Sequence, residues 1–282
     1  MRKILGLSFL SVFISSGLLA ASGTAQPASI LDVYKGGFKD DYPQELVRVR
    51  SYVLPVQSEI ATLFGMQYGQ GFLYPVTIRF DDGAPAVSEN PYFYVQTKGT
   101  GPDFRQDVVV NVEAFAKHRS DWPAKESTLR GGFRYALTQV LLNDIAAGDA
   151  DKALPLWAQE GLCVYASGNG EEFVKTAAER VRRSRVTELV GELNSPSPYL
   201  VPKDWALYYL AVKYVAVTGN LQAFVRDITS GQSAADTVRN SLNEEWPAFA
   251  EHVHAYALQA LASYAMPEED DVQTSSHDHS RR

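Results

Sequence analysis

Two consecutive segments near the middle of the chain decide the fold: Thr128-Leu-Arg-Gly-Gly-Phe-Arg-Tyr-Ala-Leu-Thr-Gln-Val-Leu-Leu142 and Leu154-Pro-Leu-Trp-Ala-Gln-Glu-Gly-Leu-Cys-Val-Tyr-Ala-Ser-Gly168. In the first segment apolar residues recur every three or four positions, at Phe133, Leu137 and Val140, which is the spacing of one helix face. The second segment has a proline near its start and a glycine at its end, as helices often do. The two segments therefore predict two consecutive helices.

The stretch Trp157-Ala-Gln-Glu-Gly161 resembles the glutamate-bearing helix of the peptidase MA-like (gluzincin) metallopeptidases. In that family this helix supplies the third zinc ligand, and the preceding helix carries the motif His-Glu-x-x-His. In the expected register this chain has Tyr135, Ala136 and Gln139 at the positions of the first ligand, the catalytic glutamate and the second ligand. Glu160 keeps the position of the third ligand. The resemblance therefore implies the scaffold of a zinc peptidase with a degenerate site.

The chemistry of the replaced residues predicts neither a metal nor a catalytic residue at this site. Two imidazoles at i and i+4 lie on one helix face and can bind one zinc ion. The neutral side chains of Tyr135 and Gln139 are poor zinc ligands, and one carboxylate, Glu160, does not replace the three protein ligands of a zinc enzyme. Ala136 has no group that could act as a general base on a metal-bound water.

The other candidate ligands and nucleophiles do not form a second site in the sequence. The single cysteine, Cys163, lies among apolar residues and is expected to be a small buried side chain. The five histidines lack a glutamate at the spacing that a zinc peptidase needs, and the pair His252 and His254 points to different faces of a helix; the full set is His118, His252, His254, His277 and His279.

The resemblance also implies the fold class, which is α+β with a small N-terminal β-sheet packed on a mainly helical C-terminal half. The chain is expected to divide into a signal peptide, a sheet subdomain, a helical subdomain with the degenerate metallopeptidase helices, and a disordered tail without apolar content. Their bounds are 1–25, 26–118, 119–265 and 266–282.

Within the sheet subdomain, residues 26–41 are expected to form a leader without regular structure. Alternating valines and arginines predict a strand at 46–53, and Pro55 is expected to open a helix that ends near Phe64. Three β-rich stretches, 74–80, 92–97 and 107–112, complete a predicted sheet of about four strands. In the helical subdomain, helices are expected from 120 to about 147 and over 155–167, 171–185, 204–218, 221–229, 234–242 and 247–264.

Composition and the N-terminus limit the cellular role. The chain has 282 residues, a formal net charge of -7 and a pI near 5.3, which argues against a nucleic-acid partner. Arg2 and Lys3 precede a mostly apolar run, and small residues at 23–25 favour cleavage after Ala25. The mature protein is therefore expected in the periplasm or secreted, without a stable membrane span.

We therefore expect an exported, catalytically inactive homologue of zinc metallopeptidases that binds a polypeptide or scaffolds an envelope partner. Two alternatives stay open: a hydrolase that recruits metal through other ligands, and a purely structural envelope protein. Without metal, an inward-facing Glu160 still needs partners, because an unpaired buried charge is costly. Tyr135 and Gln139 can both donate hydrogen bonds to its carboxylate and link the two helices; the alternative is that Glu160 faces water.

Overall fold

The computed structural model describes residues 32–34, 42–66, 72, 74–81, 90–147, 154–179, 181–193 and 200–267. Within them the fold is α+β, with a small sheet in the N-terminal part and a helical C-terminal half, as the sequence predicts. The expected signal peptide and nearly all of the expected disordered tail lie outside the described residues. Among the described helices, none is both long and apolar enough to cross a membrane.

The sheet has four strands in the order β1-β2-β4-β3. Strand β1 (Asp32–Tyr34) runs parallel to β2 (Val76–Asp81), β2 runs parallel to β4 (Arg105–Asn111), and β3 (Phe93–Lys98) is antiparallel to β4 at the edge. In β2 every second side chain is buried, which is the alternation of a strand that packs one face on a core. The three strands predicted between residues 74 and 112 are thus confirmed, with small shifts at their ends.

The strand predicted at 46–53 is wrong, because these residues belong to helix α1 (Pro43–Phe64). The valines that suggested alternation do not share a face: Val49 and Val53 are buried, whereas Val47 is 67% exposed. Burial in α1 recurs at helical spacing, through Val56 and Ile60. The expected boundary at Pro55 is also wrong, since this proline lies inside the helix. The fourth strand is instead β1, within the segment expected as an unstructured leader.

The C-terminal half is helical, and most of the predicted helices there are confirmed to within a few residues. The helix predicted over 171–185 is too long, since α5 ends at Ala178 and a 3-10 segment, η4 (Arg183–Leu189), follows. The remaining helices are α2 (Val112–Ala116), α3 (Trp122–Ala146), α4 (Leu156–Ser167), α5 (Gly170–Ala178), α6 (Pro202–Thr218), α7 (Leu221–Thr229), α8 (Ala234–Leu242) and α9 (Trp246–Ala262).

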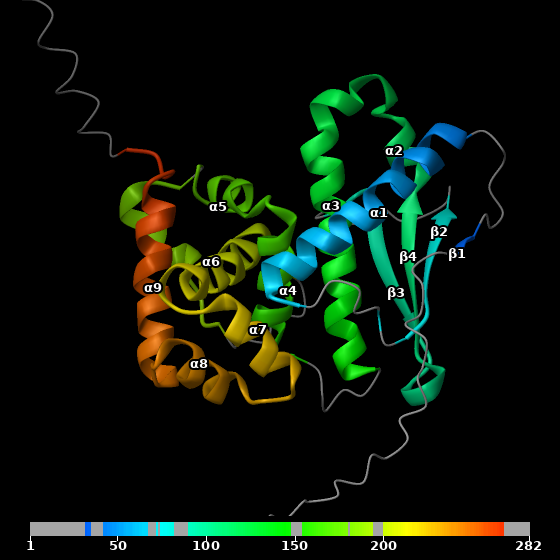
Figure 1. Ribbon diagram of the computed structural model, residues 1–282. Helices are drawn as coiled ribbons and strands as arrows, with labels where there is room; N and C mark the ends of the chain where they lie inside the picture. Colours follow the sequence, from blue (N-terminus) through cyan, green and yellow to red (C-terminus); the bar gives the residue numbers. More distant parts are fainter. Residues whose placement is uncertain are drawn as a thin grey trace, which may run out of the picture.

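Helix α3 stands between the sheet and the C-terminal helices, and α1 lies across it (Figure 1). On one side α3 packs on β3 and β4, and on the other it packs on α4. Helix α4 is in turn covered by α6, so almost all of its side chains are buried. One hydrophobic core runs through both halves, from Ile78 in the sheet to Leu210 in α6. The two helices expected to carry the candidate site therefore lie at the centre of the molecule.

Candidate functional site

The four predicted site positions lie where α3 meets α4. Tyr135 and Gln139 are partly buried on α3, one turn apart, while Glu160 on α4 is 9% exposed. Ala136 is fully buried among apolar side chains of the core. The structure thus brings Tyr135 and Glu160 together, but Ala136 lies in the core.

The expected link between the two helices is present, with one of the two proposed donors. The hydroxyl of Tyr135 donates a hydrogen bond to the carboxylate oxygen Oε2 of Glu160. No hydrogen bond joins Gln139 to Glu160 in the part of the chain that the structure describes. Because Glu160 is largely buried, the alternative in which it simply faces water is wrong. The bond is charge-assisted if the carboxylate is ionised, and such bonds are among the stronger ones in proteins.

The charge of Glu160 affects two neighbouring groups. Burial raises the pKa of the Cys163 thiol well above its ordinary value, and the nearby Glu160 raises it further. Burial also raises the pKa of Tyr208 on α6, with Asp204 and Glu160 adding to the effect. The reactive form of cysteine is the thiolate. Cys163 is therefore a buried, protonated side chain, as the sequence predicts, and not a nucleophile.

A second polar link joins α3, α4 and the sheet, and the sequence reasoning missed it. The amide nitrogen of Gln159 on α4 donates to Asn143 on α3 at 3.2 Å, and Asn143 donates to Gln106 on β4 at 3.2 Å. Gln106 is buried and donates to the Val140 carbonyl at 2.8 Å and to the Asp144 carboxylate at 2.7 Å.

A signal for this link was present in the sequence. Tyr135, Gln139 and Asn143 follow one another at intervals of four residues, so they form a polar stripe on one face of α3. The opposite helix presents Gln159 and Glu160 to this stripe. A polar stripe inside an otherwise apolar helix pattern indicates a facing set of polar groups, because buried polar groups in proteins are hydrogen-bonded.

The residues at the α3–α4 contact do not fit zinc. The contact offers a single carboxylate, a phenol and an amide, and the phenol already donates to the carboxylate. Structural and catalytic zinc sites use three or four imidazole, thiolate or carboxylate ligands. Across the described ranges, no group of three or more His, Cys, Asp or Glu side chains is placed to hold a metal ion.

The other histidines do not supplement the site. His118 lies edge-on against the ring of Tyr92 at a centroid distance of 5.9 Å. His252 lies 3.2 Å from a carboxylate oxygen of Glu244, and His254 lies on the exposed side of α9. His277 and His279 fall outside the described residues.

A scan against protein-family models, a search of curated proteins and a search of solved structures each found no match to this chain. The similarity to gluzincins therefore stays a prediction from the motif residues.

Proposed function

We propose that this chain is a non-proteolytic, polypeptide-binding protein of gluzincin-like architecture that acts in the periplasm or as a secreted protein. The single observation that supports it best is the hydrogen bond from Tyr135 to Glu160. It uses the carboxylate that the family would use for zinc to join α3 to α4. A protein organised in this way needs neither metal nor a general base at that contact. It would act by binding.

Metal content tests the first half of the proposal. The purified mature protein is dialysed and then incubated with Zn²⁺, and its bound zinc is measured by inductively coupled plasma mass spectrometry. We expect far less than one zinc ion per chain. It is also expected to leave fluorescein-labelled casein uncut. The variant Tyr135→His/Ala136→Glu/Gln139→His should bind about one zinc ion, because it restores the family's ligand set beside Glu160.

Two further variants keep this test decisive. Since Ala136 is fully buried, Ala136→Glu can prevent folding, and Tyr135→His/Gln139→His leaves that position unchanged. The triple variant with Glu160→Gln added is the matched control, and it should bind zinc more weakly. Stoichiometric zinc or casein cleavage by the unmodified protein would overturn the proposal and favour a hydrolase with other ligands.

Binding tests the second half. The probe is reduced, carboxymethylated α-lactalbumin, a permanently unfolded polypeptide, and the measurement is its fluorescence anisotropy during titration. Saturable binding supports the proposal, and no binding contradicts it.

The expected export is tested separately by intact-mass measurement of the protein from its native host, where a retained Met1 would contradict it.

A further inference from the structure

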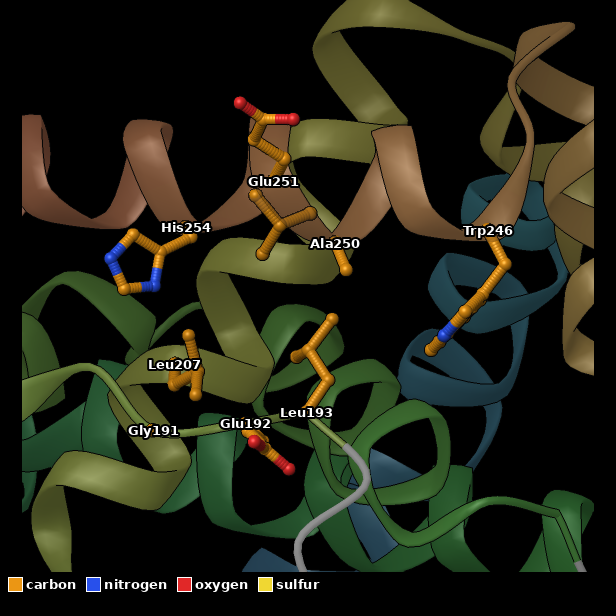
Figure 2. Close-up of a pocket in the computed structure, with 9 residues that line it drawn as sticks. Gly191, Glu192, Leu193, Leu207, Trp246, Ala250, Glu251 and His254 are labelled. Atoms are coloured by element: carbon orange, nitrogen blue, oxygen red, sulfur yellow. The ribbon is translucent and has the colours of Figure 1, made fainter.

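The helical half contains a pocket of about 360 Å³ between α6, α9 and residues 191–193 (Figure 2). Figure 2 shows Leu193 and Ala250 pointing toward one another across it, whereas the carboxylate of Glu251 points away from it. The pocket is lined mainly by apolar side chains, so its chemistry does not define what would occupy it. Reactive chemistry in this half of the molecule lies instead at the start of α5.

Asn169 and Gly170 join α4 to α5 and form the single Asn-Gly pair in the sequence of the chain. Such a pair is prone to spontaneous deamidation, because a glycine without a side chain lets its backbone nitrogen reach the side chain of the asparagine. The glycine is required here, since a Cβ atom at Gly170 would lie 2.2 Å from the ring of Tyr209 on α6. The close packing of α5 on α6 therefore keeps a reactive pair at this position.

The side chain of Asn169 is not held by a capping bond. Asn169 is the N-cap residue of α5, where the side-chain oxygen of an asparagine commonly accepts a hydrogen bond from the first turn. Here that bond is absent, and within the described residues the side-chain amide makes no other hydrogen bond. The residue is also partly exposed to solvent. The side-chain carbon Cγ of Asn169 is therefore open to attack.

The backbone of Asn169 controls whether the attack occurs. Its ψ is 6°, so the nitrogen of Gly170 nearly eclipses the nitrogen of Asn169 and is turned away from the side chain. The two reacting atoms can meet only after this angle has changed. That change breaks the 3.1 Å hydrogen bond from the Glu172 N–H to the Asn169 carbonyl, so the first turn of α5 has to open. Local opening at the end of an element costs less free energy than global unfolding.

We propose that Asn169 is a site of spontaneous deamidation, and that opening of the first turn of α5 sets the rate. In the open form the Gly170 nitrogen forms a bond to Cγ of Asn169. The bond from Cγ to the side-chain nitrogen breaks, and this nitrogen takes up the proton of the Gly170 amide and leaves as ammonia. Water then opens the cyclic imide at one of its carbonyl carbons and gives aspartate or isoaspartate. The reaction consumes water and changes no oxidation state.

The isoaspartate product is expected to loosen α5. Its backbone is longer by one CH₂ group, and the buried Gly170 has no free space beside the ring of Tyr209. The added group therefore has to displace the first turn of α5. That turn is held on α6 by the 2.9 Å hydrogen bond from the Tyr209 hydroxyl to Glu171. The modified chain should lose this contact.

The test compares the folded protein with a synthetic peptide of residues 166–172, both kept in the same mildly alkaline buffer. The tryptic peptide 153–175 contains Asn169, and its fragment mass spectrum at successive times gives the converted fraction. We expect the folded protein to convert about ten- to hundredfold more slowly than the synthetic peptide. In Asn169→Gln, whose side chain would have to close a larger ring, the tryptic peptide should stay unconverted.

Two results of this comparison would overturn the inference. Equal rates in the folded protein and the synthetic peptide would show that the fold does not control the reaction. The other is an unconverted Asn169 at the time when a reaction about a hundredfold slower than that of the peptide would be half complete. It would show that the folded chain is not modified at this position.

A matched pair of variants tests the role of the first turn of α5. Tyr209→Phe removes the hydrogen bond to Glu171 and should speed the conversion of Asn169 about threefold, because the turn opens more easily. Tyr214→Phe is the control on the same helix, since it removes a 2.8 Å hydrogen bond to Glu244 and should leave the rate unchanged. If the two variants convert at the same rate, opening of α5 does not set the rate and the inference is wrong.

Discussion

Helix α4 contacts two neighbours through different kinds of surface. Toward α6 it presents Gly161, and a Cβ atom there would lie 2.4 Å from the Tyr208 carbonyl oxygen and 2.8 Å from a Val212 methyl group. Toward α3 it comes close near Gly131, where a Cβ atom would lie 2.7 Å from the Ser167 carbonyl oxygen. Along the rest of that contact the helices are joined by the hydrogen bonds of Glu160 and Gln159.

The difference shows that one helix can be held by close fit on one side and by paired polar groups on the other. The α4–α6 contact depends on a close steric fit at Gly161, so it does not accommodate an added methyl group. The α3–α4 contact depends on paired polar groups, so it tolerates replacement as long as the partners are kept or removed together. The four predictions below test this contrast, from the largest expected effect to the smallest.

The largest effect is expected from Gly161→Ala. The added methyl group would overlap the Tyr208 carbonyl, a backbone atom of α6 that cannot turn away. Because the overlap is with a backbone atom, we expect overpacking to cost about 3 kcal/mol, the upper end of its usual range, and the better helix propensity of alanine to offset about 1 kcal/mol. We expect a net loss of about 2 kcal/mol in the free energy of unfolding, measured with urea. Gly191→Ala, where a Cβ atom meets nothing within 4 Å, is the control; equal effects at both positions would refute the steric account.

The second prediction concerns the link between α3 and α4. Tyr135→Phe leaves the carboxylate of Glu160 without this donor and should cost about 1–2 kcal/mol of folding free energy. Glu160→Gln keeps the size of the side chain but removes its charge. The double variant should lose less than the sum of the two single losses, because the residues are coupled. Additive losses would show that the bond contributes nothing to stability.

A smaller effect is expected at the second polar link. Gln159→Ala removes the 3.2 Å hydrogen bond to Asn143 at a partly buried position, and we expect a cost of about 0.5–1 kcal/mol. Gln139→Ala is its matched control on α3, since the side chain of Gln139 makes no hydrogen bond within the described residues. If the two variants unfold at the same urea concentration, Gln159 does not help to hold α3 and α4 together.

The smallest effect is expected from Glu171 on α5. Its carboxylate is exposed, so it can be compared with the buried carboxylate of Glu160. Burial by itself raises the pKa of Glu171, but the hydrogen bonds from Lys213 and Tyr209 outweigh it, so the pKa is lowered from its ordinary value. Because the pKa is lower in the folded chain, ionised Glu171 stabilises the fold above about pH 4.3, the ordinary pKa of glutamate. This contribution is lost as the pH falls through the pKa of the folded chain.

Glu171→Gln should therefore lower stability at pH 7 by a few tenths of a kcal/mol, since the pair with Lys213 is largely solvent-exposed. The difference from the unmodified protein should shrink as the pH falls below about 4.3, the ordinary pKa of glutamate, as measured by urea denaturation from pH 7 downward. Glu172→Gln removes a carboxylate at the next exposed position and is the charge-matched control at pH 7. A difference between Glu171→Gln and the unmodified protein that is constant with pH would contradict the assigned pKa shift.

The apolar periodicity of the sequence was sufficient to predict the helices from residue 122 onward and three of the four strands. Leu137 and Val140 recur at helical spacing because one face of α3 is buried, and that spacing can be read without a structure. A link from Tyr135 or Gln139 to Glu160 could also be predicted, because the resemblance places all three at ligand positions and a buried carboxylate needs a donor.

Other features were decided only by tertiary contacts. Residues 46–53 fit either a strand or a helix, and they are helical because α1 packs across α3 with Val49 and Val53 inward (Figure 1). The short strand β1 exists through its pairing with β2, which local sequence does not encode. Tyr135 rather than Gln139 binds Glu160, because the choice between two donors one turn apart depends on how α4 is placed against α3. Helix α4 contacts both α3 and α6, and such long-range contacts are not expressed by any local pattern.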